Sequence, residues 1–202
     1  MAANGASVAM SGLNGGNRGE WRAGSFGGSY DRRVTRSRYF DRYTGFRQGA
    51  QITIAIASGD TPSIAACDLY EGRVDASPAI EVVLDPVTYI CAFLTADGQR
   101  VGEMMIGAEI AADLSARSER RGDLDLGGRQ YSVRSLHEFE NVQVPSGTPL
   151  AYLIKRDGRA IGAVTLDGAP SLVEAVYIDD KDKMALSLAS VALALMVDPA
   201  TY

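Results

Sequence analysis

The sequence predicts an α+β fold in which an antiparallel β-meander curls into a barrel-like sheet around a C-terminal hydrophobic helix. Three patterns support this prediction: alternating apolar stretches separated by Gly-containing turns, one amphipathic stretch with helical spacing, and an uncharged apolar stretch near the C-terminus. The chain has 202 residues, of which 46% are hydrophobic and 22% are charged. These values are ordinary for a globular protein and exclude a fibre or a wholly disordered chain.

Residues 1–49 differ from the rest and predict a flexible N-terminal arm ahead of a single β-rich domain over residues 50–202. The arm is rich in Gly, Ser and Asn at its start and carries eight arginines against three acidic residues, whereas the whole chain has a net charge of −5. It also holds seven of the fifteen aromatic residues. The arm therefore either folds back onto the acidic domain or meets an anionic group elsewhere.

Arginines interleaved with aromatic side chains make the arm the candidate binding region, because the two residue types together can stack and bind anions. The candidate residues are Arg32, Arg33, Arg36, Arg38, Tyr39, Phe40, Arg42 and Tyr43. No nucleic-acid-binding motif accompanies them. A protein partner or self-association through the arm is therefore favoured, and nucleic acid is disfavoured.

Three β-strands and a β-hairpin are predicted in the first half of the domain. Residues 51–57 alternate between Ile and small residues, and residues 63–70 can form the neighbouring strand. Residues 80–84 form a third strand, which Asp85-Pro86 is expected to end. Residues 87–102 form a hairpin around Asp97-Gly98, since Asp-Gly supplies the positive φ angles of a tight turn.

Residues 105–117 predict a second, amphipathic helix. Ile106, Ile110 and Leu114 are four residues apart and therefore form one apolar face, with charged residues elsewhere on the surface. A second hairpin is expected over residues 124–133, around Gly127-Gly128.

Residues 150–178 predict a meander of three strands with turns at Asp157-Gly158 and Asp167-Gly168. The pattern at residues 154–162 also matches that at residues 94–102, 60 residues earlier. The match indicates either a duplicated half-barrel or the repeated use of a common turn, and both interpretations stay open.

Residues 184–197 contain no charge and predict a buried helix. Fourteen residues give a helix of about 21 Å, shorter than the ~30 Å hydrocarbon core of a bilayer. No transmembrane segment is therefore predicted. Apolar side chains face every direction, so the helix must be buried on all sides. Asp179, Asp180 and Asp182 suit its N-terminus, where carboxylates meet free amide groups and the positive end of the dipole.

Residues 147–166, 172–178 and 184–197 together resemble the tubby, phospholipid scramblase and LURP-one-like superfamily. The resemblance implies a closed antiparallel barrel that encloses a C-terminal hydrophobic helix. It also implies binding of phosphoinositides or other anionic lipids, or a scaffold role, rather than hydrolysis. The basic lipid-binding residues of tubby domains have no motif-level match in this chain, so none is transferred.

Catalytic and metal-binding residues are scarce. A single histidine, His137, and two cysteines, Cys67 and Cys91, exclude a zinc site of the usual kind, and neither a metal nor a cofactor is expected. The cysteines lie in apolar surroundings and are predicted as small core residues, with a disulfide left open. Ser135 and His137 share one face of a strand, but no buried carboxylate is placed beside them. No catalytic residue is therefore assigned.

Three functions remain. A non-enzymatic binding or scaffold domain, whose arm docks a partner, is favoured. The alternatives are a tubby-like lipid-binding module and an enzyme that uses carboxylates or His137. A cytoplasmic location is expected, since residues 1–16 lack the pattern of a signal peptide.

Overall fold

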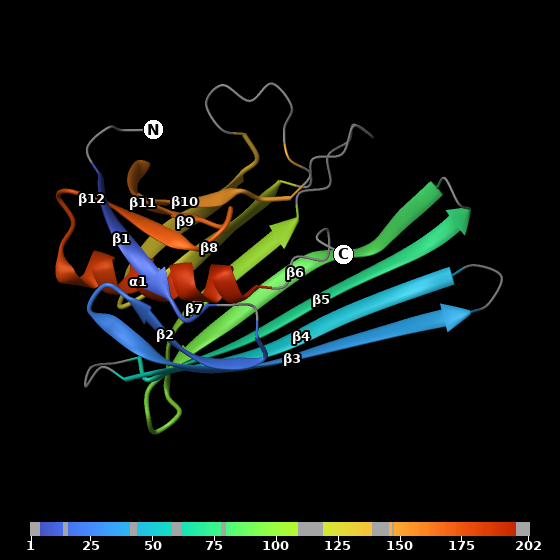
Figure 1. Cartoon of the computed structure of the whole chain (residues 1–202), viewed down its shortest axis with the longest axis horizontal. Helices are drawn as coiled ribbons and strands as arrows, with labels where there is room; N and C mark the ends of the chain where they lie inside the picture. The colour runs from blue at the N-terminus through green and yellow to red at the C-terminus, as the bar shows by residue number, and fades with distance from the viewer. Residues whose placement is uncertain are drawn as a thin grey trace.

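The structure is a computed structural model that describes residues 5–13, 16–40, 44–57, 62–77, 80–108, 119–138, 146 and 148–196; the side chains of residues 38–40, 44–47, 73–77 and 80–85 lie outside this description. Within this part of the chain, twelve antiparallel strands close into a barrel that holds one helix, α1 (Asp180–Leu195) (Figure 1). The strands are β1 (Gly5–Ser11), β2 (Arg18–Ala23), β3 (Phe26–Phe40), β4 (Thr44–Ile56), β5 (Ile64–Ser77), β6 (Ile80–Leu94), β7 (Arg100–Ala108), β8 (Arg120–Leu126), β9 (Arg129–Leu136), β10 (Ala151–Arg156), β11 (Arg159–Thr165) and β12 (Ser171–Ala175).

The barrel is a continuous meander, in which each strand pairs with the strand before it and the strand after it. The first and last strands complete the circle, with Val8 of β1 opposite Leu172 of β12. In the part of the barrel around α1, closure gives every strand two neighbours, which removes the exposed edges that an open sheet would leave there. Residues 33–40 of β3 extend past β2 and pair with β4 alone.

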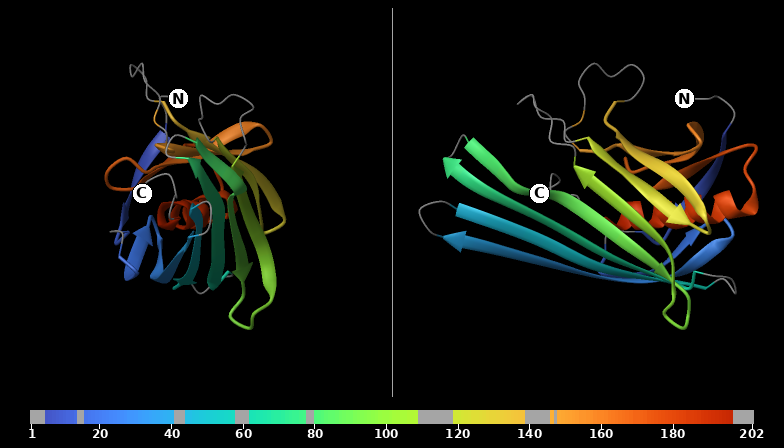
Figure 2. Two further views of the ribbon diagram at one scale, coloured as in Figure 1. Left: turned by 90° about the vertical axis from the view of Figure 1, so that its right-hand side faces the viewer. Right: turned by 180° about the vertical axis from the view of Figure 1, so that it is seen from behind.

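The wall of the barrel has two parts of different length. The strands β3 to β6 have 13 to 15 residues each, whereas the other eight have five to nine. Figures 1 and 2 show that the four long strands continue past the C-terminal end of α1. The helix therefore lies in the part of the barrel where all the strands surround it.

Helix α1 forms the centre of the hydrophobic core, as the sequence predicts. Leu186, Val191 and Leu193 have at most 1% of their surface exposed, and the view along the barrel in Figure 2 shows strands around the whole helix. The wall faces it with alternating apolar residues, such as Ile52 and Ile54 of β4. This agrees with the rule that a helix apolar on all faces must be covered on all faces.

Where the structure describes it, the N-terminal arm predicted over residues 1–49 is instead part of the barrel. Residues 5–11, 18–23 and 26–40 are the strands β1, β2 and β3, and the expected boundary at residue 49 lies within β4. Trp21 and Tyr30 supply the reason, since both side chains are buried in the core with at most 3% exposed. These two aromatic residues anchor β2 and β3, and the glycines between them do not prevent β-structure.

Two other expectations for the first half are corrected. The helix predicted at residues 105–117 is wrong over Met105–Ala108, which belong to β7, and residues 109–117 lie outside the described part. Met104 and Ile106 are buried and Met105 is half exposed, so the period of burial is two rather than four. The stop expected at Asp85-Pro86 is absent, because β6 continues through it with an irregular register.

The remaining strand predictions are confirmed. The hairpin of β8 and β9 turns at Gly127 and Gly128, which have φ angles of 62° and 74°. The meander predicted over residues 150–178 corresponds to β10, β11 and β12. In these segments the alternation of apolar residues and the turn residues indicate the same strands, so the local sequence is sufficient to predict them.

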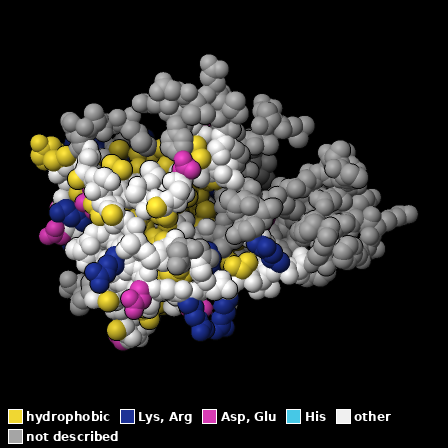
Figure 3. All heavy atoms as spheres, in the orientation of Figure 1, with side chains coloured by type: hydrophobic (Ala, Val, Ile, Leu, Met, Phe, Trp, Pro, Cys, Tyr) yellow, Lys and Arg dark blue, Asp and Glu magenta, His cyan; other side chains and the backbone are white. Residues whose placement is uncertain are grey.

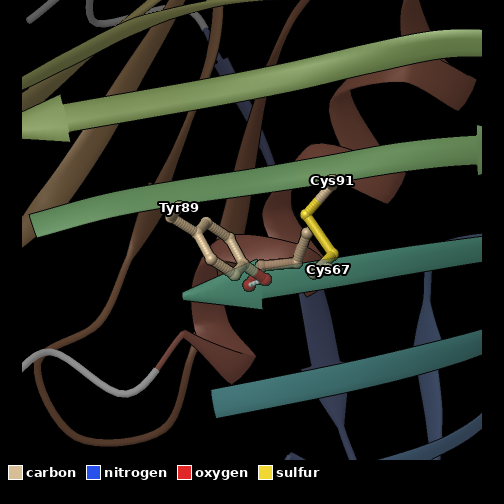
Figure 4. Close-up of a disulfide and its surroundings, with 4 residues drawn as sticks. Cys67, Tyr89 and Cys91 are labelled. Carbon is tan, nitrogen blue, oxygen red and sulfur yellow. Dashed lines mark hydrogen bonds between the residues drawn. A yellow bond between two sulfur atoms is a disulfide. The ribbon is translucent and has the colours of Figure 1, made fainter. Parts of the chain in front are cut away.

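Cys67 and Cys91 form a disulfide between two neighbouring strands. They lie directly opposite each other in the register of β5 and β6, 24 residues apart in sequence. Both are buried on the inner face of the wall, close to Tyr89 (Figure 4). The expectation of buried cysteines is confirmed, and the pairing that the sequence left open is settled by the register.

We expect the double substitution Cys67→Ala and Cys91→Ala to lower the free energy of unfolding by roughly 3 kcal/mol, because a bridge across 24 residues restricts the unfolded chain. Urea denaturation of both proteins measures this, with wild type refolded under reducing conditions as a second test. Ser132→Ala, at an exposed site on β9, is the control and should stay within about 0.5 kcal/mol of wild type. Equal stabilities of wild type and the double variant would contradict the bridge.

Candidate ligand-binding groove

The barrel wall parts at the end where α1 begins, between β11 and β12. Their pairing runs from Thr165 opposite Ser171 to Gly162 opposite Glu174 and stops there. On its other side, β11 has an irregularity against β10 that leaves Ile161 without a register partner. Such a bulge bends the strand that carries it, which accounts for the separation of β11 from β12.

This separation leaves a groove with a volume of about 700 Å³, beside the start of α1. Its walls are mostly apolar and include Leu153, Ile161 and Val173. Figure 3 shows hydrophobic side chains gathered over the part of this face where Figure 1 places β1, β11 and β12. A concave, mainly apolar surface with a few polar groups is the usual form of a small-molecule site.

The floor of the groove is a buried ionic network centred on Asp182, in the first turn of α1. The residue is fully buried, and its carboxylate accepts hydrogen bonds from Arg156, from Arg129 at 2.9 Å and from the Tyr131 hydroxyl at 3.0 Å. A buried carboxylate is tolerated only when partners of this kind replace water. The network therefore fixes the start of α1 against β9 and β10.

Asp179, one of the three acidic residues expected at this helix N-terminus, completes the network as the N-cap of α1. Its carboxylate accepts the backbone N–H of Asp182 at 3.0 Å and a hydrogen bond from Arg129 at 2.6 Å. The Arg129 hydrogen bond lowers the pKa of Asp179 to about 2. Burial, together with the hydrogen bond to Asp182, raises the pKa of Tyr131 to about 12. Both groups thus keep their bonding forms at neutral pH.

The rim of the groove carries groups that are open to solvent. Val176 and Tyr177, which follow β12, are 57% and 96% exposed, unlike most large apolar residues of the described chain. Arg159, at the start of β11, is exposed and has no ion-pair partner within the described residues. The rim therefore offers one cation and two apolar side chains to a ligand.

The arginines predicted as a binding site are separated by the strand geometry of β3. Arg32 is half-buried, and its guanidinium donates to the Leu195 carbonyl at the end of α1, at 3.5 Å. Arg33 points the other way, with 76% of its side chain exposed and Asp31 at 3.9 Å. Arg36 is also exposed. The other predicted residues cannot be compared in this way. The structure describes only the backbone of Arg38, Tyr39 and Phe40, and Arg42 and Tyr43 lie outside the described residues.

Ser135 and His137 do share a face, as predicted, and they are hydrogen-bonded inside the barrel. The Ser135 hydroxyl lies 2.9 Å from His137 Nε2 and accepts the backbone N–H of Arg120 at 2.8 Å. His137 Nδ1 lies 3.0 Å from the Ser146 carbonyl. Among the described residues no carboxylate bonds to the ring, and both nitrogens have partners. This arrangement ties the ends of β8 and β9 together.

The described residues contain no cluster of three or more His, Cys, Asp or Glu side chains suited to a metal ion. Helix α1 has 16 residues, and within the described segments no helix is long and apolar enough to cross a lipid bilayer. No family model, curated protein or solved structure matches this chain. The groove must therefore be interpreted from its own chemistry.

The groove residues were not singled out by sequence reasoning. Arg156 and Arg159 flank an Asp-Gly turn, where charged residues are common, and Tyr177 ends an apolar strand. The useful signal was the acidic start of α1, because one side of its first turn, which carries Asp182, packs against the wall. An acidic residue there requires buried cations nearby.

Replacing Asp179 by Asn should change how stability depends on pH. Folding lowers the pKa of this carboxyl, so the carboxylate stabilises the folded state at pH values above its ordinary pKa of 3.8. This stabilisation is lost as the pH falls towards about 2. The urea midpoint of wild type should therefore fall more steeply than that of Asp179→Asn between about pH 4 and about pH 2.

Urea midpoints measured across this range provide the check, with Asp180→Asn as the control at a fully exposed neighbouring carboxylate. The control curve should run parallel to wild type. Parallel curves for Asp179→Asn as well would show that its bond to Arg129 does not contribute.

Proposed function

We propose that this chain is a non-enzymatic binding domain, and that the groove between β11 and β12 takes an amphipathic ligand with an anionic head. The observation that carries the proposal is the occupied interior of the barrel. In the region around α1, helix and wall are in direct contact, so the ligand must bind at the surface.

The contact between α1 and β11 shows how closely the interior is filled. A Cβ atom at Gly162 would collide with the Leu186 side chain and with the Val173 carbonyl. The glycine therefore lets α1 approach the wall more closely than any side chain would allow. Leu186 and Leu172 on either side of this contact are fully buried. This packing supports a ligand site in the wall rather than behind it.

The groove suits an amphipathic ligand because it combines apolar walls with one available cation. Leu153, Ile161 and Val173 can cover an acyl or aryl body, and burial of such a body is favourable in proportion to its area. Arg159 can pair with a carboxylate or phosphate at the rim. Arg156 is already engaged by Asp182, so Arg159 is the group expected to distinguish an anionic ligand from a neutral one.

The lipid-binding alternative drawn from the resemblance to the tubby and scramblase superfamily agrees with this ligand chemistry. A barrel that closes around a C-terminal helix is the architecture that the resemblance implies, and an anionic lipid is an amphipathic molecule of the kind described. Membership of that superfamily is part of the proposal, because it rests on architecture alone.

A dansyl-labelled fatty acid should bind wild type saturably, with a blue shift of its emission as the dansyl group leaves water. Ala160→Trp, at an exposed position lining the groove, should abolish the shift by filling the site. Arg159→Glu should weaken binding several-fold, as expected for the loss of a partly exposed ion pair worth about 1 kcal/mol.

Two variants away from the groove are matched controls. Ala96→Trp adds the same ring at the exposed turn between β6 and β7, and Arg18→Glu reverses an exposed arginine on β2. Both should bind the probe as wild type does. Equal binding by Ala160→Trp and wild type would refute the groove as the site.

A second candidate function, the docking of an acidic protein partner along β3, is favoured by the exposure of Arg33 and Arg36. The strand holds both residues in fixed positions, Arg33 on its outer face and Arg36 on the opposite face, the one that also carries Arg32. Attraction between this strand and an acidic surface would be screened by salt, because the charges are exposed.

We expect the double variant Arg33→Glu and Arg36→Glu to lose several-fold in affinity for fluorescein-labelled polyglutamate, measured by anisotropy at about 50 mM salt. Affinity of wild type should decline as salt rises to about 300 mM. Lys181→Glu with Lys183→Glu changes the same number of charges at the start of α1 and is the control. An equal loss in both double variants would mean that net charge, and not β3, determines binding.

A further inference from the structure

We propose that the open edge of β3, over residues 33–40, binds an acidic peptide segment of a partner protein as an added β-strand. This form of docking rests on the second candidate function above and specifies the conformation of the partner. Strand β3 pairs with β2 only as far as Asp31, whereas its pairing with β4 continues to Phe40. Figures 1 and 2 show this part of β3 at the border of the four long strands.

Two backbone hydrogen bonds show which way the peptide groups of β3 point. The carbonyl of Gly27 accepts the N–H of Ala57 at 2.8 Å, so the odd-numbered residues of β3 direct their peptide groups towards β4. The N–H of Arg32 donates to the carbonyl of Asn17 at 2.7 Å, so the even-numbered residues direct theirs to the opposite side, where β2 lies. Peptide groups alternate in this way along any antiparallel strand.

The alternation continues past the end of β2, because the pairing of β3 with β4 has no irregularity up to Phe40. Val34 and Arg38 therefore direct their peptide groups to a side where the described strands provide no neighbour. An edge of this kind is a template for another strand. The N–H and carbonyl groups of an extended peptide would pair with it as β2 pairs with the first half of β3.

The opposite border of the long strands, in β6, is less suited to an added strand. Residues 80–85 pair with β5 alone within the described residues, but the register shifts three times between Tyr70 and Ser77. Pro86 also follows directly and has no N–H to donate. The regular edge of β3 is therefore the better template.

The charge of the β3 edge favours an acidic strand. Residues 32–40 contain four arginines and no acidic residue. Opposite charges on neighbouring strands stabilise their pairing, whereas like charges destabilise it. Pairing with the same edge of a second copy would bring arginines together, so charge complementarity selects a partner that carries glutamate or aspartate.

The positions of the exposed arginines define the pattern of that partner. Arg33 and Arg36 are three residues apart and lie on opposite faces of β3. An antiparallel partner therefore needs two acidic residues three apart, one on each face. Val34, between them, packs against the hydrophobic core and holds this part of the edge in place. In strand addition, backbone hydrogen bonds supply the affinity and side-chain pairs supply the specificity.

A fluorescein-labelled octapeptide, Val-Thr-Glu-Thr-Glu-Thr-Val-Glu, places Glu opposite both Arg33 and Arg36 when it pairs antiparallel. We expect saturable binding to wild type in anisotropy at about 50 mM salt, with a Kd of about 0.1 mM. N-methylation of its third, fifth and seventh residues removes N–H groups directed at β3 and should weaken binding at least about tenfold. N-methylation of its second, fourth and sixth residues removes N–H groups directed at solvent and should leave binding unchanged.

A pair of variants tests the same contact from the protein side. Val34→Pro removes an N–H that faces the open edge, and proline is tolerated on an edge strand at such a position. Val34→Ala loses side-chain contacts at the same position but keeps the N–H. We expect Val34→Pro to bind the octapeptide about tenfold more weakly than Val34→Ala, with both variants folded by circular dichroism.

The outcomes separate strand addition from docking by charge alone. Equal binding of the two methylated peptides would overturn strand addition, while a loss of affinity in the double variant Arg33→Glu and Arg36→Glu would still support docking along β3. If neither polyglutamate nor the octapeptide bound wild type in a salt-dependent way, the docking itself would be refuted. A wild-type dimer in sedimentation that Val34→Pro dissociates would assign the edge to a second copy and overturn the acidic partner.

Discussion

A helix enclosed by a barrel has to find partners inside the wall for the backbone groups at both of its ends. Four N–H groups and four carbonyls at the ends of a helix lack intrahelical partners, and those that the wall covers must find their partners within the protein. At the start of α1, Asp179 caps one amide and Asp182 is held by Arg129, Arg156 and Tyr131. Asp179 thus replaces solvent for one backbone amide, and the wall pairs the buried carboxylate of Asp182.

The other end of α1 is satisfied in the same way from the opposite side of the barrel. Tyr89 of β6 donates to the Ala192 carbonyl at 2.9 Å, and Arg32 of β3 reaches the Leu195 carbonyl. The positive charge of Arg32 also lies at the negative end of the helix dipole, where α1 itself has no basic residue. Burial strongly raises the pKa of Tyr89, which keeps its hydroxyl protonated and donating.

These end contacts connect the core to the surface. Tyr89 lies beside the Cys67–Cys91 bridge (Figure 4), so the wall that holds the end of α1 is also covalently joined. Arg156 holds Asp182 from within the groove between β11 and β12, so the ionic network that fixes the helix also forms the floor of the proposed site. Disulfides persist mainly in oxidising compartments, and this bridge weighs against the cytoplasmic location that the sequence alone suggests.

Local sequence was sufficient to predict a helix or a hairpin wherever only one structure fits the local pattern. The uncharged stretch that ends at residue 197 had to be buried, since its apolar side chains cover every face of a helix, and the acidic residues before it indicated the N-terminus of that helix. The hairpins with Gly127-Gly128 and Asp157-Gly158 followed from their turn residues. In contrast, the strand character of residues 26–40 depends on pairing with distant segments, because glycines and arginines have no strong preference for strands.

The sequence by itself determined that a hydrophobic helix would lie inside a β-structure, because the burial of uncharged side chains needs no knowledge of the partner. Only the tertiary structure decided which strands surround it, that Cys67 lies opposite Cys91, and that Arg32 serves the helix while Arg33 faces outward. Register and the direction of each side chain result from pairing between segments far apart in the chain, and a shift of one residue would reverse them all. The proposed groove between β11 and β12 arises from this pairing, at the bulge of β11.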